Sequence, residues 1–152
     1  MQSDEYVGIP YKLNGTGREE GVDCLGLCRL FYMEHGWGLD FRDNGEPYTY
    51  DNMGSHKNWK RLVRYLNRNM KHVKRKKLQF GDLIVFNVRG DAHLGIYIQD
   101  DYVLAQMVPC KEGETSSVLY HKNIWDLGFK WAFRRKEETN AGTSSKDAGG
   151  EG

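Results

Sequence analysis

The chain has 152 residues, of which 39% are hydrophobic and 12% aromatic, a composition that excludes a disordered chain. This length suits one domain with a buried core and is short for two. The 22 Lys and Arg residues nearly balance the 21 Asp and Glu, and a formal net charge of +1 argues against a dedicated polyanion binder. No stretch has the length and hydropathy of a membrane span, and the first residues do not resemble a secretory signal peptide. We therefore expect synthesis in a reducing cytoplasm and no membrane partner.

The first strong structural signal is a helix that begins at Cys24. Asp23, immediately before it, is a residue type that caps helix N-termini with its side-chain oxygen. Apolar residues then recur at helical spacing, namely Leu27, Leu30 and Phe31. Gly36 and Gly38 are expected to end the helix, and the Asp-, Asn- and Tyr-rich segment 39–54 is expected to be a loop.

A second amphipathic helix is predicted over residues 56–70, with Ser55 as its cap. Its apolar stripe consists of Trp59, Leu62, Val63, Leu66 and Met70. Nine of the 22 basic residues, and no acidic residue, fall between Lys60 and Lys77. This basic run is either the solvated side of the helix or a patch that faces an anionic polymer, and the sequence leaves both open.

Beyond Lys77 the apolar period changes from helical to alternating, which is typical of strands. Strands are predicted at 78–88, 92–99, 101–109, 116–121 and 129–134, with a turn at Asp100 and Asp101 between the second and the third. Helices followed by strands define an α+β domain, here helices packed on an antiparallel sheet of about five strands. We expect this domain to occupy residues 1–135 and the polar segment 136–152 to be a disordered tail.

Each of the three cysteines could be a metal ligand, half of a disulfide, a buried core residue or a catalytic nucleophile. Cys24 and Cys28 are one helical turn apart, but Cys110 and five scattered histidines do not complete the paired knuckles of a structural zinc site. We therefore expect no metal, no cofactor and no closed disulfide framework. Cys28, deeper in the helix, is expected to be core. Cys24 lies in the first helical turn, where the helix dipole favours a thiolate and lowers the thiol pKa, and it is the candidate nucleophile.

A general base for that thiol is sought among the histidines. His93 begins the most apolar strand, HLGIYI. A polar imidazole in such a strand is expected either to have a hydrogen-bond partner or to have a functional role. Alternation places His93, Gly95 and Tyr97 on one face and Leu94, Ile96 and Ile98 on the other. The apolar face is expected to meet the core, and the glycine beside His93 is expected to leave room for the helix that carries Cys24. A satisfied structural histidine is the alternative.

Three motifs in order, GVDCLGL, GDLIVF and AHLGIYI, resemble the NlpC-type cell-wall cysteine peptidases, a papain-like family. The upstream segment GIPYKLNGTG resembles the tyrosine-containing, glycine-rich segment of that family, and the resemblance covers roughly residues 5–108. The helix continuation CRLFYMEHGWGLDF resembles the members carried by tailed bacteriophages.

The resemblance implies that Cys24 is the nucleophile and His93 the general base of a peptide-bond hydrolase. It implies that Tyr11 lines the substrate cleft and assists the oxyanion, and that Asp23 corresponds to the acid before the cysteine, for which helix capping is the simpler role. The Cys24 backbone N–H would form part of the oxyanion hole.

This sequence departs from the family at the third catalytic position, the residue that orients the histidine. The family usually has a second histidine or another polar residue there, on the strand after the one that carries the base. Family spacing places Ala105 there, and alanine cannot orient an imidazole. A two-residue turn at Asp100 and Asp101 would pair Gly95 with Gln106, so that Gln106 shares the face of His93 and orients it. A three-residue loop would instead leave Ala105 in that place.

The expected function is hydrolysis of a peptide or amide bond in peptidoglycan stem peptides, by a phage tail-associated or lysis enzyme that ends in the virion or acts on the wall. Other phage tail proteins are then possible partners. The alternative is a weakly active or inactive tail assembly protein on the same fold. A thiol acyltransferase stays open as well, because the same dyad serves both reactions. Nucleic acid is a less favoured partner, because the basic run lacks interleaved surface aromatics.

Overall fold

The computed structural model describes residues 4–38, 41–43 and 46–136. Its centre is a six-stranded antiparallel sheet with the order β5-β10-β6-β7-β8-β9. The strands are Met70–His72 (β5), Leu83–Val88 (β6), Asp91–Gln99 (β7), Tyr102–Gln106 (β8), Ser117–His121 (β9) and Phe129–Arg135 (β10). The α+β prediction is confirmed, and the main sheet has one strand more than the sequence indicated.

Local turn chemistry sets the strand boundaries of the central hairpins. Asp100 and Asp101 both have left-handed backbones, with φ of 53° and 68°, and form the tight turn between β7 and β8. Gly81 has φ of 91° just before β6, and a Cβ there would lie 2.6 Å from the Trp37 ring, so glycine is required on both grounds. The turn between β7 and β8 therefore lies where the sequence placed it. The strand predicted from residue 78 begins later, at Leu83, after the turn at Gly81.

The first helix agrees with its prediction. α1 spans Cys24–Glu34, and Gly36, with φ of 72°, follows its C-cap. The remaining short helical segments are Asp4–Tyr6 (η1), Tyr50–Asn52 (η2), Arg75–Lys77 (η3), Lys122–Trp125 (α3) and Asp126–Gly128 (η4).

The second helix is shorter than predicted. α2 spans Lys60–Asn69 and begins after Trp59, whose backbone is left-handed with φ of 45°. Ser55 is not its cap, because the Ser55 carbonyl accepts the N–H groups of Asn58 and Trp59 in a separate turn. Met70, expected to end the helix, instead begins β5, which pairs with β10 and forms the additional strand.

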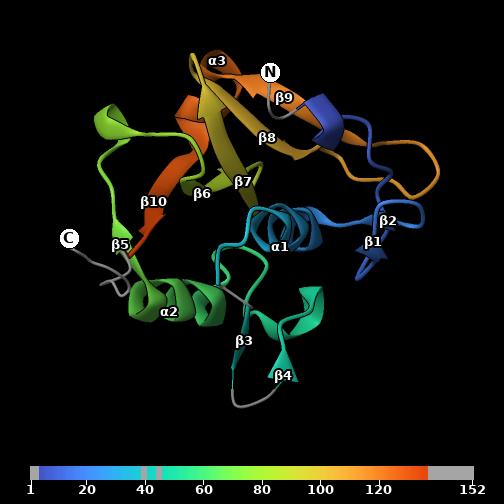
Figure 1. The fold of residues 1–152 in the computed structure, drawn as a ribbon, viewed down its shortest axis with the longest axis horizontal. Coiled ribbons are helices and arrows are strands. Elements are labelled where there is room, and N and C mark those ends of the chain that lie inside the picture. Colours follow the sequence, from blue (N-terminus) through green and yellow to red (C-terminus); the bar gives the residue numbers. More distant parts are fainter. Residues whose placement is uncertain (1–3, 39–40, 44–45, 137–152) are drawn as a thin grey trace.

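The two faces of the sheet have separate cores. One face packs against α1 and α2, and its cluster includes Leu94, Ile96 and Ile98 with most of the buried residues of α1. The other face carries a smaller cluster around Trp125, with Ile84 and its neighbours. Figure 1 shows α1 at the centre of the molecule, between the sheet and the short hairpin of Arg42–Asp43 (β3) and Glu46–Pro47 (β4).

Two short hairpins lie where the sequence suggested only irregular chain. Thr16–Gly17 (β1) pairs with Gly21–Val22 (β2) beside the start of α1, and β3 pairs with β4 inside the expected loop 39–54. Both are too short to show strand alternation, so their pairing depends on the elements that they contact. Residues of both hairpins line a cavity of about 320 Å³ beside the start of α1.

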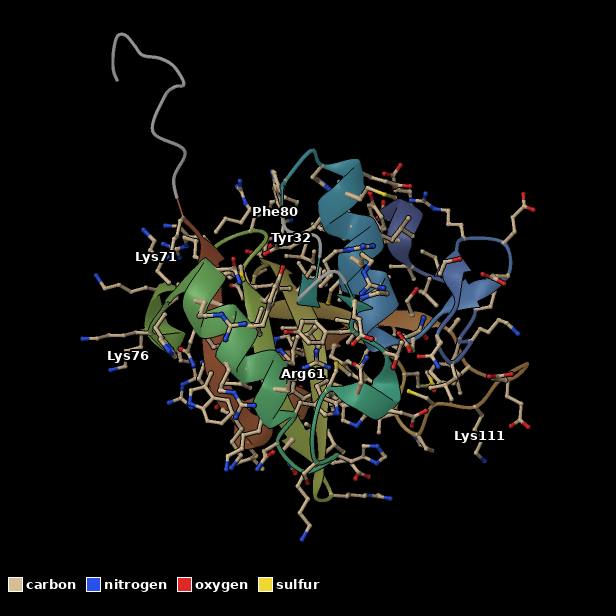
Figure 2. All side chains as sticks on the ribbon, turned by 90° about the horizontal axis from the view of Figure 1, so that it is seen from below. Tyr32, Arg61, Lys71, Lys76, Phe80 and Lys111 are labelled. Carbon is tan, nitrogen blue, oxygen red and sulfur yellow. The ribbon has the colours of Figure 1, made fainter. Side chains whose placement is uncertain are left out.

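The basic run 60–77 occupies the exposed side of α2, then β5 and η3. Figure 2 shows Lys71 and Lys76 extending away from the body of the protein at this edge. Arg75 pairs with Asp126 at 3.1 Å, and Lys136 donates to the Arg68 carbonyl at 2.9 Å. Apart from Lys136, the tail predicted over 136–152 lies outside the described residues, and the domain boundary at residue 135 stays a prediction. The helices of the described segments are all too short or too polar to cross a membrane.

Candidate active site

Asp23 fixes the start of the helix that carries Cys24. Its Oδ1 accepts the backbone N–H of Gly26 at 2.8 Å, and its Oδ2 accepts the N–H of Asn14 at 2.9 Å. The side chain is 5% exposed, so both bonds form largely out of water. The predicted helix cap is confirmed, and the same carboxylate also ties the turn before β1 to the helix.

Gly26 allows the β1–β2 hairpin to approach the first turn of α1 closely. A Cβ at this position would lie 2.9 Å from the Gly15 carbonyl oxygen and 3.1 Å from the Val22 Cβ. Backbone oxygen cannot retreat as a flexible side chain can, so a larger residue would displace the hairpin. The packing around the first turn of α1 therefore requires a glycine at this position.

Cys24 and His93 line the same pocket, which has a volume of about 210 Å³. Tyr11 and Asp23 also line it, so four of the five predicted site residues meet there. Trp59, Asp91, Ala92, Val108, Pro109 and Cys110 complete the lining. The sequence argument did not assign Cys110 or Trp59 to the site. No local pattern signals them, because they come from a loop and from the left-handed residue before α2.

Burial sets the protonation of the candidate dyad. Burial, followed by the nearby Asp23 carboxylate, raises the pKa of the Cys24 thiol well above its usual range, and a hydrogen bond from the Leu94 backbone N–H opposes this. Burial lowers the pKa of His93, while Asp91 acts in the other direction. The expected lowering of the thiol pKa by the helix terminus is therefore wrong. Both directions favour a neutral thiol and, near neutral pH, a neutral imidazole.

His93 occupies the face of β7 opposite to α1. It alternates with Ala92 and Leu94, which belong to the core beneath α1, and its ring lies 5.9 Å from that of Phe86 and 6.5 Å from that of Trp59. The helix was expected to dock on the His93 face, and this is wrong, because Val103 and Ala105 fill the space beside Gly95. Cys24 and His93 nevertheless reach one pocket, at the end where β7 begins.

Gln106 does not share the face of His93, so the structure contradicts its predicted placement. Gln99 pairs with Tyr102 as the two-residue turn requires, but the register then shifts at a bulge, and Tyr97 rather than Ile98 pairs with Val103. Continuing this register places Ala105 opposite Gly95.

The Gln106 amide forms hydrogen bonds away from His93. Its Nε2 donates to the carbonyls of Val22 at 2.9 Å and Ile9 at 3.3 Å, which ties β8 to the chain before α1. Its Oε1 is buried and has no hydrogen-bond partner among the described residues. The structure therefore assigns Gln106 a bridging position and provides no contact through which it would orient His93.

No three His, Cys, Asp or Glu side chains within residues 4–38, 41–43 and 46–136 are arranged to hold a metal ion.

Solved structures share this α+β fold. An NlpC/P60 family protein from Bacillus cereus matches with a TM-score of 0.56 at 25% identity, over 86% of this chain and 36% of that one. The NlpC/P60 domain of the peptidoglycan hydrolase SagA matches at 0.52 and 17% identity, over 88% and 92% of the two chains. The peptidoglycan hydrolase RipB from Mycobacterium tuberculosis matches at 0.52 and 20% identity, over 90% and 62%. The fold is therefore that of NlpC/P60 domains.

Residues 8–127 match the model of the NlpC/P60 family, and the chain belongs to that family. A probable endopeptidase from Haemophilus influenzae is 31% identical over 106 residues, which cover 68% of this chain and 53% of that protein. The chain thus spans about half the length of this relative. The resemblance found in the motifs is confirmed at the level of the family, and the bacteriophage-type assignment stays a prediction.

Proposed function

We propose that this protein is a cysteine peptidase that hydrolyses a peptide or amide bond in the stem peptides of bacterial peptidoglycan. The observation that carries the proposal is the pocket shared by Cys24, at the capped start of α1, and His93, at the start of β7. Membership of the NlpC/P60 family supports it, as do the names of relatives, which include an endopeptidase and peptidoglycan hydrolases.

The protonation of the dyad suggests how the reaction begins. Because the thiol and imidazole are both neutral, His93 takes the thiol proton as the Cys24 sulfur attacks the carbonyl carbon. The backbone N–H of Cys24 and the Tyr11 hydroxyl are the proposed donors to the oxyanion. The C–N bond then breaks and the His93 imidazolium protonates the leaving amine. A water molecule, deprotonated by His93, hydrolyses the thioester and restores both groups.

The test is digestion of purified sacculi and synthetic stem peptides, with released amines and fragments identified by mass spectrometry. Cys24→Ala is expected to abolish cleavage. Cys28→Ala is the matched control, because Cys28 lies one helical turn further on, is fully buried and does not line the pocket. Equal cleavage by the parent and Cys24→Ala proteins would refute a thiol mechanism.

The finer proposal is a tail-associated or lysis enzyme of a bacteriophage, made in the cytoplasm and acting from the virion tail or on the wall after release. It rests on the phage-like continuation of α1, CRLFYMEHGWGLDF. The test is whether the protein co-purifies with phage tails or with the walls of lysed cells. Finding it only in the cytoplasm of cells that carry no phage would contradict this proposal.

A second candidate is a weakly active or inactive tail assembly protein on the same fold. The observation in its favour is the third catalytic position, where Ala105 lies opposite Gly95 in the extended register and the Gln106 amide bonds to Ile9 and Val22 instead. Absence of cleavage on walls of several chemotypes, together with normal folding, would favour this candidate.

A further inference from the structure

Asp91 lies in the active-site pocket, on the strand that carries His93. It is the first residue of β7, and it lines the pocket together with Cys24 and His93. Alternate residues of a strand share a face, so Asp91 and His93 lie on one face of β7, while the buried Ala92 between them belongs to the core beneath α1. Two residues of a strand span roughly 6–7 Å. The strand therefore brings a carboxyl group close to the candidate base.

The hairpin turn before β7 fixes the backbone position of Asp91. Both residues of the turn 89–90 have left-handed backbones, with φ of 54° and 92°, as a tight two-residue turn requires. The side chain of Asn87 closes the turn by accepting the N–H of its second residue at 2.9 Å. On the other side of Asp91, the Ala92 N–H donates to the His56 carbonyl at 2.6 Å. The backbone is thus held from both directions, although Asp91 itself is exposed to solvent.

The two carboxylates of the pocket act on different members of the dyad. Burial raises the pKa of the Cys24 thiol, and Asp23 adds to this effect. Burial lowers the pKa of His93, and Asp91 opposes this effect, because an anion nearby favours the protonated imidazole. On β8, the third catalytic position is occupied by Ala105 in the extended register, which has no charge to offer. The anion that supports a positive charge on His93 therefore comes from its own strand.

Other titratable groups surround this end of β7. They are Tyr11, Asp23, Cys24 and Cys110 in the pocket lining, His56 and Lys57 in the segment whose carbonyls bind β7 and the end of β6, and Arg89 in the turn before β7. The oxygens of Asp23 each accept a backbone N–H at the start of α1, so that carboxylate is committed to the helix. Asp91 is therefore the acid whose removal tests the electrostatics of His93 without disturbing α1.

We propose that Asp91 is a positioning residue for the reaction, whose carboxylate stabilises the His93 imidazolium as His93 takes the proton of Cys24. The inference rests on the proposed function. Transfer of the proton from a neutral thiol to a neutral imidazole creates a thiolate and an imidazolium, and the nearby anion favours the second of these charges. When the imidazolium protonates the leaving amine, its charge disappears, and so does the stabilisation. Asp91 thus acts through His93 and does not itself exchange a proton.

The main test is Asp91→Asn, which removes the charge and nearly keeps the shape. Charges at this separation in a partly exposed site change a titration by roughly 0.5–1 pH unit. We expect His93 of the variant to titrate lower by that amount in NMR of the labelled full chain, with its signal assigned by its absence from His93→Gln. On the plateau of the pH profile, kcat/KM on stem peptides is expected to fall about 3- to 10-fold, the ratio that corresponds to this shift. The acid limb of the profile should move to lower pH by the same amount.

Two further variants separate charge from structure. Asp91→Glu keeps the carboxylate and is expected to restore most of the titration of His93 and of kcat/KM. Asp100→Asn is the matched control, because it removes an exposed carboxylate at the other end of β7, outside the pocket, where φ of 53° suits asparagine. It is expected to change neither quantity. A merely structural role for Asp91 would lower activity without moving the titration of His93.

The NMR titration needs no turnover, so it separates failure of this inference from failure of the peptidase proposal. A lower titration of His93 in Asp91→Asn, in a protein that cleaves no stem peptide, would support the electrostatic contact and refute the peptidase proposal alone. An unchanged titration and an unchanged pH profile in Asp91→Asn would overturn the inference and leave the peptidase assignment intact. Loss of activity with an unchanged titration of His93, which Asp91→Glu does not restore, would overturn it as well.

Discussion

The protonation of the three thiols can be tested by alkylation with iodoacetamide. The helix-terminus argument predicts a reactive Cys24, whereas burial in the folded protein predicts a slow one. We expect Cys110 to react first, Cys24 more slowly, and Cys28 only on unfolding. The order follows exposure, since Cys110 is partly accessible while Cys24 and Cys28 are 6% and 0% exposed.

The expected rate for Cys110 follows from its pKa, which burial raises from 9.0 to about 11. At pH 8 this lowers the thiolate fraction roughly 100-fold relative to an unstructured cysteine. The greater nucleophilicity of a more basic thiolate restores roughly tenfold, at a Brønsted coefficient of about 0.4–0.5. The net expectation is alkylation about tenfold slower than that of a free cysteine. Cys24, whose pKa is raised further, is expected to be slower still.

The assay is peptide-resolved mass spectrometry of timed alkylation between pH 7 and 9. Rates at Cys24 and Cys110 are expected to rise about tenfold per pH unit without a plateau, because both groups titrate above this window. Cys110→Ser, run in parallel, separates the two pocket thiols. Faster labelling at Cys24 than at Cys110 near neutral pH, with a plateau, would refute the burial argument and indicate an activated thiolate.

Three further predictions concern stability and the pH profile. Arg134→Leu removes both hydrogen bonds, each 2.9 Å long, that the guanidinium donates to the buried Asp82 carboxylate. We expect it to lower the free energy of unfolding by about 2–3 kcal/mol in urea titrations, and a loss below about 1 kcal/mol would contradict this. Burial lowers the pKa of His93, so we expect kcat/KM to fall only below pH 6.5, where this base becomes protonated. A loss of kcat/KM on acidification that already begins above pH 7 would contradict a lowered pKa. Gly26→Ala gains about 1 kcal/mol of helix propensity but adds a contact 2.9 Å from a backbone oxygen, costing about 1–3 kcal/mol. Calorimetry should show net destabilisation, whereas Gly38→Ala, with open space around it, should be nearly neutral.

The parts of the fold that were predicted correctly depend on short-range signals. Asp23 caps α1 because its side chain reaches the N–H three residues on, and the turn at Asp100 and Asp101 forms within its own four residues. The alternation along β7 likewise separates Leu94 from His93 without knowledge of neighbouring elements. These features are encoded in local backbone preferences and in the periodicity of apolar residues.

The predictions that failed depend on distant partners. Trp59 adopts a left-handed backbone and ends up buried beside the pocket, so α2 starts later than its apolar stripe suggests. Met70 leaves the helix because β10 offers a strand to pair with. One bulged residue in β7 changes the register of β8, and that shift alone moves Gln106 to the opposite face from His93.

The sequence by itself determined the family, the candidate nucleophile and base, and the α+β order of elements, because motif residues and periodicity are properties of adjacent positions. Only the tertiary structure decided which side chains share a pocket, and it added Cys110 and Trp59 to the lining of the candidate site. It also set the direction in which the pKa of Cys24 moves, because the helix terminus acts through a few neighbouring N–H groups whereas desolvation comes from every element packed around the thiol.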